Sequence, residues 1–202
     1  MQGFSIINLK SMIEQIGEPE TKERLSNFSC PLNKDVEYFI KHKAIEFAKQ
    51  SIAVTYLVFA QYKNENVIAA YFTLASKFIA IYRQSLSAKM RKRIARFCQY
   101  DPAIKRYTLP APLIAQLGKN YYGGYNKLIT GDELLKIACD KVVESQRIVG
   151  GKIVYLECED KQKLIDFYSS NGFVIFGKRT LDRDETDLNE GQYLVQMLKY
   201  LE

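Results

Sequence analysis

The stretch "KIVYLECEDKQKLIDFYSSNGFVIFGKR", residues 152–179, holds the pattern that decides the fold. Residues 152–159 and 173–179 are rich in β-branched and aromatic side chains, which favours two strands. The residues between them, 160–172, predict a short helix with Asp160 as its N-cap and an Asn-Gly pair at its end. A strand, a helix and a strand in succession are typical of an α/β fold.

The preceding segment, "YNKLITGDELLKIA" at 125–138, predicts the start of a longer helix. Thr130 and Glu133 have the spacing of a capping box, in which the threonine oxygen accepts the N–H of the glutamate and the glutamate reaches back. Gly150 and Gly151 are expected to end this helix. Its buried side is expected to contain Leu134, Ile137, Ala138, Val142 and Val149.

The rest of the chain supplies enough elements for one mixed sheet. Pro110 and Pro112 indicate that their strand is an edge or begins there, while residues 113–117 can be central. We therefore predict a single mixed α/β domain over residues 1–202. The further elements expected are an amphipathic helix at 32–51 with Asn33 as N-cap, a hairpin of 52–60 and 66–75, and a last strand at 191–201 after an acidic turn at 181–191.

Composition excludes several classes of protein. No stretch approaches the roughly 18 apolar residues of a membrane helix, so we expect a soluble, cytoplasmic protein without a membrane partner. The four cysteines lack the short spacings of a zinc site, and no metal is expected. Reduced thiols are the simplest interpretation in a chain of 202 residues.

Positive charge is concentrated in one segment. The chain carries a net charge of +6, yet residues 83–106 contain eight basic residues and one acid, so they alone carry +7. Leu86, Met90, Ile94 and Phe97 recur there at helical spacing, which predicts a basic helix in an insert at about 77–107. This face is either simply solvated or a surface for a polyanion.

A helix that begins directly after a loop offers unpaired N–H groups and the positive end of its dipole to a phosphate. Gly123, Gly124 and Gly131 would let the backbone come close to such an anion. The same glycines are equally compatible with an ordinary flexible turn and helix start.

From about Phe28 to Leu198 the chain resembles the GNAT superfamily of acetyl-CoA-dependent N-acetyltransferases. The resemblance rests on the order of elements, on the strand "LIAQLGKN" at 113–120 and on the turn "FYSSNGF" at 167–173. It implies a mixed, mostly antiparallel sheet with helices on both faces, and acetyl-CoA as cofactor. The backbone groups of Leu117 and Lys119 would bind the pantetheine arm.

The resemblance also implies a loop for the diphosphate of CoA. The loop of the family carries Gln or Arg, then Gly, then Gly or Ala, and the matching positions here are Asn126, Ile129 and Gly131. The first two depart from the pattern. The cofactor-binding residues expected from this loop are Asn126, Lys127, Leu128, Ile129, Thr130 and Gly131.

In many GNAT members a tyrosine at the position of Tyr168 lies near the sulfur of CoA. A phenol with an ordinary pKa of about 10 keeps its proton at neutral pH and can give it to a departing thiolate, so Tyr168 is a candidate general acid. The alternative is a tyrosine that only packs in the core. Glu157 and Glu159 end the preceding strand, but the general base stays unassigned, and His42 is expected at the surface.

Within the superfamily, residues 27–59 are similar to the start of the GNAT-type toxins of bacterial toxin-antitoxin pairs. These toxins acetylate aminoacyl-tRNA, so the resemblance implies an amine substrate on a macromolecule, tRNA bound by the basic helix Arg83–Arg106, and an antitoxin. Attraction of tRNA phosphates should weaken steeply with salt. A homodimer is also an option, because terminal strands can pair across subunits.

Three functions are compatible with the sequence. The first is acetyl transfer to a macromolecular amine, on aminoacyl-tRNA or a protein. The second is acetyl transfer to a small amine, with the basic segment only solvated. The third is a non-catalytic GNAT-like binding module, because Asn126 and Ile129 depart from the CoA-binding pattern.

Overall fold

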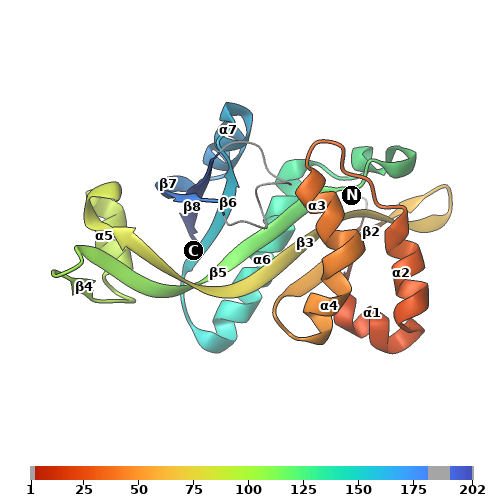
Figure 1. Cartoon of the computed structure of the whole chain (residues 1–202), viewed down its shortest axis with the longest axis horizontal. Helices are drawn as coiled ribbons and strands as arrows, with labels where there is room; N and C mark the ends of the chain where they lie inside the picture. The colour runs from red at the N-terminus through yellow and green to blue at the C-terminus, as the bar shows by residue number, and fades with distance from the viewer. Residues whose placement is uncertain (1–2, 182–191, 202) are drawn as a thin grey trace. The chain divides into compact units, whose positions relative to one another are not determined.

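The computed structural model describes residues 3–181 and 192–201. The chain forms two compact units, of which unit 1 contains Met1–Ala75 and Ile114–Ala138 and unit 2 contains Ser76–Leu113 and Cys139–Glu202. Two long strands, β3 (Glu65–Tyr82) and β5 (Arg106–Lys119), pass through both units, as does helix α6 (Gly131–Val149) (Figure 1). None of the helices described is long and apolar enough to cross a membrane.

Unit 1 covers its strands with a layer of helices (Figure 1). The strand order is β1-β2-β3-β5, and both β1 and β3 pair antiparallel with β2. Helices α1 and α4 contact β2. The elements are β1 (Ser5–Asn8), α1 (Leu9–Ile16), α2 (Glu18–Ser26), α3 (Lys34–Tyr38), a π-helical turn (Phe39–Lys43), α4 (Ala44–Lys49) and β2 (Val54–Tyr62).

The predicted amphipathic helix at 32–51 is confirmed. Asn33 accepts the N–H of Val36, and the apolar positions 36, 39, 40 and 44 are buried in the core of unit 1. A single π-helical turn interrupts this helix, which apolar spacing alone does not reveal. None of the elements before residue 27 was predicted, although Asn8 is an ordinary side-chain cap of α1.

The predicted hairpin of β2 and β3 is confirmed as well. Its turn contains Lys63 and Asn64, both with positive φ, which matches the right-handed twist of paired strands. Strand β3 is longer than predicted, since it continues to Tyr82.

The basic segment is not one helix. Residues Arg83–Ser85 form a 3₁₀ turn, α5 covers only Ala88–Ile94, and β4 (Tyr100–Asp101) pairs with β5. Leu86 and Ile94 are buried as predicted, but Phe97 lies beyond the helix and is 40% exposed. The predicted insert at 77–107 is therefore partly the outer ends of β3 and β5, which continue as strands because they are neighbours in the sheet.

The prediction that Pro110 and Pro112 mark an edge or a strand start is wrong, because β5 begins at Arg106 and lies between β3 and β6 in the strand order. A proline lacks the N–H that a central strand donates. The two prolines are two residues apart, so their missing donors face the same side of the strand. Only one of the two neighbouring ladders loses hydrogen bonds.

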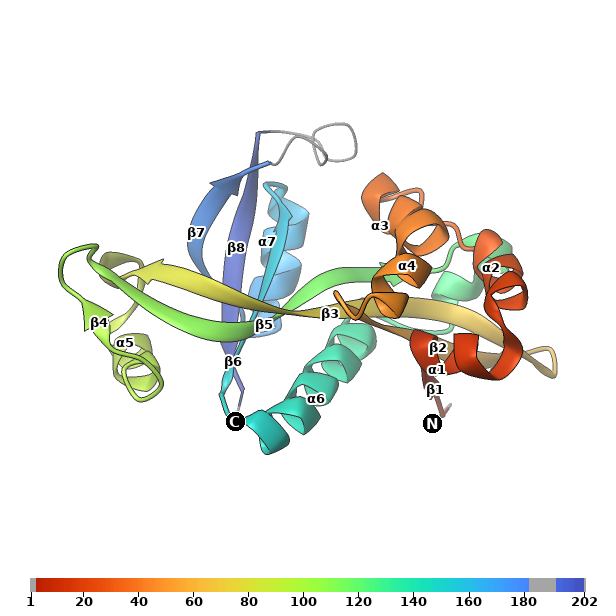
Figure 2. The same ribbon diagram turned by 60° about the horizontal axis from the view of Figure 1, so that its bottom comes forward.

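Unit 2 contains the strand order β3-β5-β6-β8-β7, and β8 pairs antiparallel with both β6 and β7. Helix α7 contacts β6 (Figure 2). The stretch 152–179 thus forms the strand, helix and strand predicted for it. Their bounds are β6 (Ile153–Glu159), α7 (Gln162–Ser170), β7 (Val174–Thr180) and β8 (Tyr193–Tyr200).

Two details of unit 2 correct the predictions. Asp160 does not cap α7, because its carboxylate pairs with Lys178 at 2.5 Å and Lys161 takes the N-cap position without a side-chain bond. Val149 is 77% exposed, since it belongs to the last turn of α6, where the helix ends at Gly150. The acidic turn predicted at 181–191 lies almost entirely outside the described residues.

Candidate active site

Strand β5 approaches α3 closely at one glycine of unit 1. A Cβ at Gly118 would lie 2.3 Å from Cγ1 of Val36, far inside van der Waals contact. The backbone of β5 is therefore packed directly under α3. The predicted pantetheine-binding residues Leu117 and Lys119 flank this glycine, and both are half-buried.

Asn120 fixes the chain where β5 ends. This side chain is 4% exposed. Its oxygen accepts the N–H groups of Ser29 and Tyr122 at 3.0 Å each, and its amide donates to the carbonyl of Ile68 at 2.9 Å. Because three backbone segments converge on one buried amide, the loop that follows β5 has a defined starting point.

That loop is a short 3₁₀ segment, Tyr122–Lys127. Gly123 and Gly124 both adopt left-handed φ values, 60° and 77°. A Cβ at Gly123 would also lie 2.9 Å from the ring of Tyr125, so this position needs glycine for both space and conformation. Asn126 and Lys127 end the segment, the former half-buried and the latter exposed.

The capping box at the start of α6 is confirmed. Glu133 donates its N–H to the Thr130 hydroxyl oxygen at 3.1 Å, and its carboxylate accepts the N–H and the hydroxyl of Thr130 at 2.8 Å each. The backbone N–H of Thr130 first, and its hydroxyl second, lower the pKa of Glu133. A carboxylate thus already occupies part of the helix terminus at which a diphosphate is expected.

Ile129 has a structural role that the resemblance did not indicate. Its side chain is 2% exposed, so it anchors the loop to the core where the family pattern has glycine. Leu128 beside it is half-buried, and Gly131 begins the helix. The predicted cofactor-binding residues from Leu117 to Gly131 all lie in unit 1.

Tyr168 lies on α7 in unit 2. Its ring contacts Phe167 and Phe173, with ring centroids 4.9 and 6.0 Å apart. Burial of the hydroxyl is the main cause that raises the pKa of Tyr168 well above its usual value, and the nearby Cys158 thiol adds to it. The phenol therefore stays protonated throughout the neutral range.

The carboxylates at the end of β6 are both paired. Glu157 accepts from Arg179 Nε at 2.6 Å and from Gln196 at 2.8 Å, and Glu159 pairs with Lys161 at 3.1 Å. Both carboxylates are therefore engaged in ion pairs, and neither is assigned as the general base. His42 is exposed, as predicted, and its ring lies 4.7 Å from Tyr38.

Cys158 is the feature of this unit that sequence reasoning missed. It is 7% exposed, and burial raises the pKa of its thiol to about 11. The thiol is therefore neutral beside the Tyr168 hydroxyl. In the sequence, only the position of Cys158 near the end of a predicted strand could have indicated that its thiol lies near Tyr168.

A second polar cluster holds the segment before α3 in unit 1. The Glu37 carboxylate accepts from Lys41 Nζ and from the N–H of Cys30, both at 2.7 Å. The hydrogen bond from Lys41 first, and that from Cys30 second, lower the pKa of Glu37. The charged form of this glutamate thus stabilises the fold.

We expect Glu37→Gln to lower the thermal midpoint at pH 7. A depressed pKa contributes stability above the unfolded value of about 4.3, and this contribution is lost as the pH falls through the folded value. The difference between variant and wild type should therefore shrink below about pH 4. Thermal melts from pH 3 to 7 measure it, with the exposed Glu23→Gln as control. A difference that stays constant over this range would contradict the role of the charge.

Comparison with known proteins supports the fold strongly. No family model and no curated protein sequence matches the chain. A structure described as AtaT complexed with acetyl-methionyl-tRNAfMet matches it with a TM-score of 0.62 at 15% identity, over 96% of this chain and 94% of that chain. The chain has the fold of the AtaT toxin. The GNAT-like fold predicted from the sequence is confirmed by this match.

Two further structures share the AtaT-like fold. A tyrosine-to-phenylalanine mutant of KacT matches with a TM-score of 0.62 at 15% identity, over 97% of this chain and 94% of that chain. AtaTR bound with AcCoA matches with a TM-score of 0.55 at 15% identity, over 95% and 91%. These identities are low, so the similarity concerns the backbone and not the individual site residues.

Proposed function

We propose that the protein is an N-acetyltransferase that moves an acetyl group from acetyl-CoA to a primary amine on a macromolecule, with aminoacyl-tRNA as the first candidate. The observation that carries the proposal is a match over nearly the whole chain to AtaT with an acetylated aminoacyl-tRNA and to AtaTR with acetyl-CoA. The resemblance found in the sequence and the fold found in the structure support the same chemistry.

The residues of unit 1 fit such a cofactor. Gly124 has open space where a side chain would lie, and α6 begins at Gly131, directly after this loop, with the positive end of its dipole. The backbone of Leu117 and Lys119 would bind the pantetheine arm, and the segment Asn126–Gly131 the diphosphate. The carboxylate of Glu133 would have to leave the N–H of Thr130 if a phosphate took that donor.

Tyr168 would supply the proton that the reaction needs. As the amine attacks the thioester carbonyl, the carbon–sulfur bond breaks and the thiolate leaves. The phenol would donate its proton to that sulfur, and its raised pKa keeps this proton available at neutral pH. The proton lost by the amine would pass to solvent.

The segment 83–106 carries a charge of +7 and would attract the phosphates of the tRNA. This attraction does not depend on the nucleotide sequence. An antitoxin partner belongs to the same proposal, because the matching structures include a mutant AtaT toxin bound to the C-terminus of the antitoxin AtaR. A homodimer and a cytoplasmic location are proposed with it. A small amine as acceptor would leave the charge of this segment without a role.

One observation favours a second function, a binding module without catalysis. The capping box places a carboxylate on the helix terminus that CoA would use, and a resident anion there opposes a diphosphate. In that case the protein would keep the GNAT-like fold but would not bind acetyl-CoA.

Calorimetry with acetyl-CoA separates these functions. We expect saturable binding, a thermal midpoint that rises with ligand concentration, and release of free CoA when aminoacyl-tRNA is added. Competition by bulk tRNA that weakens steeply with salt would support the macromolecular acceptor. CoA released by small amines but not affected by tRNA would support the small acceptor. Absence of acetyl-CoA binding would overturn the enzymatic proposal.

A further inference from the structure

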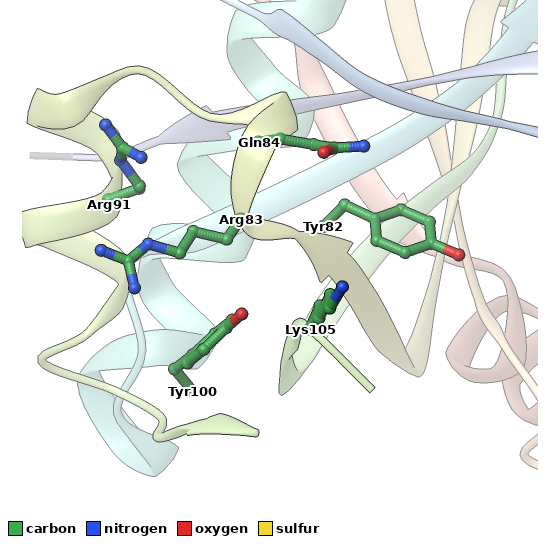
Figure 3. Close-up of a pocket in the computed structure, with 6 residues that line it drawn as sticks. All are labelled: Tyr82, Arg83, Gln84, Arg91, Tyr100 and Lys105. Carbon is green, nitrogen blue, oxygen red and sulfur yellow. The ribbon is translucent and has the colours of Figure 1, made fainter. Parts of the chain in front are cut away.

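A basic pocket of about 420 Å³ lies in unit 2, at the outer ends of β3 and β5. It is lined by Tyr82, Arg83, Gln84, Arg91, Tyr100 and Lys105 (Figure 3). The pocket thus combines three cations, two aromatic rings and one amide, and contains no acid. All six residues lie within the insert predicted at about 77–107.

The cations of this pocket have no acidic partner in the described part of the chain. No carboxylate among residues 3–181 and 192–201 lies within ion-pair distance of Arg83, Arg91 or Lys105. Asp101, the one acid of the segment, is engaged in its own turn, where its side chain accepts the N–H groups of Ala103 and Ile104 at 2.8 and 3.4 Å. Charge that is left unpaired in a concave site favours an anionic ligand.

The aromatic rings are already held by cations. The guanidinium carbon of Arg83 lies 5.2 Å from the centroid of the Tyr100 ring, and Figure 3 shows its side chain between Arg91 and Tyr100. That of Arg106 lies 4.0 Å from the centroid of Tyr82, and its side chain also bonds the Tyr82 hydroxyl. Tyr82 is nevertheless 43% exposed. An exposed ring whose orientation is fixed from one side can stack a planar group on the other.

Phosphate-binding cations beside an exposed ring are the combination that binds unpaired nucleotides. We propose that this pocket binds one nucleotide of single-stranded RNA, with the phosphodiester on Arg83, Arg91 and Lys105 and the base stacked on Tyr82. Gln84 can hydrogen-bond a base edge or the 2′-hydroxyl. The choice of RNA rests on the proposed function, whereas the charge and the ring are properties of the pocket itself. An acidic polypeptide would use the cations but not the ring.

Fluorescence anisotropy with a labelled hexamer of adenosine tests the proposal on the full chain. We expect Tyr82→Leu to weaken binding about five- to a hundredfold, and Tyr82→Phe to retain most of it, because stacking needs the ring. Arg83→Gln should flatten the salt dependence, lowering its logarithmic slope by about 0.7 for one lost phosphate contact. Lys22→Ala on α2 and Tyr193→Leu on β8 are the matched controls. Equal thermal midpoints establish that each variant is folded.

Binding that survives Tyr82→Leu unchanged would overturn the stacking site. So would a duplex that binds as tightly as the hexamer, or polyglutamate that displaces the hexamer at equal charge. Acetyl-CoA calorimetry on the same variants keeps the two proposals apart. RNA binding without acetyl-CoA binding would overturn the acetyltransferase proposal and support the RNA-binding pocket. Acetyl-CoA binding without any RNA binding would overturn the RNA-binding pocket and support the acetyltransferase proposal.

Discussion

Tyr168→Phe should lower turnover about a hundredfold or more while leaving the affinity for acetyl-CoA unchanged, because general acid catalysis typically contributes 10² to 10⁴ in rate. The substitution removes only the hydroxyl. The ring contacts to Phe167 and Phe173 remain, so folding should be preserved. Release of free CoA measures turnover, and calorimetry measures binding.

The control for Tyr168 is Tyr193→Phe, which removes a hydroxyl from an exposed tyrosine of β8 in the same unit. We expect wild-type turnover from it. The rate of Tyr168→Phe should also recover in part with an acyl donor whose thiol is more acidic, because its thiolate leaves without needing a proton. Unchanged turnover in Tyr168→Phe would remove the tyrosine from the catalytic machinery and leave it as a core residue.

Gly118→Ala should lower the free energy of unfolding by about 1–3 kcal/mol, which corresponds to a thermal midpoint roughly 5 °C lower. The new Cβ would lie 2.3 Å from Cγ1 of Val36, whereas the other nearest atoms lie at an ordinary 3.6 Å. The backbone of Gly118 has no left-handed φ, so the cost arises from this one overlap. Acetyl-CoA affinity should fall too, because the neighbouring backbone of Leu117 and Lys119 would shift with the strand.

A double-mutant cycle isolates this overlap. Val36→Ala removes the clashing methyl group, and by itself should cost about 1 kcal/mol for a lost contact in the core. Combined with Gly118→Ala it should be less destabilising than the sum of the two single changes. Chemical unfolding measures the free energy of unfolding of each variant. If the two losses add, the contact of β5 with Val36 is not what restricts position 118 to glycine.

Local signals in the sequence predicted much of the fold. The capping box at Thr130 and Glu133, the cap at Asn33 and the strands on either side of α7 depend on residues close in the chain, and the structure contains them all. The failures depend on partners far away. Asp160 pairs with Lys178, 18 residues on, instead of capping the helix beside it. Helical spacing at 86–97 could not show that β3 and β5 continue as paired strands.

The candidate site was less predictable than the fold. Tyr168 could be singled out only by resemblance, because no pattern around it specifies chemistry alone. The helix start and its glycines indicated an anion site at the loop 126–131, but its assignment to CoA came from the resemblance. Glu157 and Arg179, which form an ion pair, are 22 residues apart in the chain, so no local sequence pattern predicts their contact. The burial of Ile129 was not predicted either. Its apolar side chain favours a core position, but the resemblance placed it in a loop expected to bind a diphosphate.

The carbonyl of Tyr168 accepts the N–H of Asn171 at 3.2 Å and that of Phe173 at 3.0 Å, and Gly172 between them has a φ of 83°. The phenol therefore belongs to a rigid corner rather than to a free helix end. The direction of the Tyr168 ring is set by a chain reversal that only glycine makes without strain, so we expect a residue with a Cβ at 172 to disturb the proposed acetyl transfer as well as the fold.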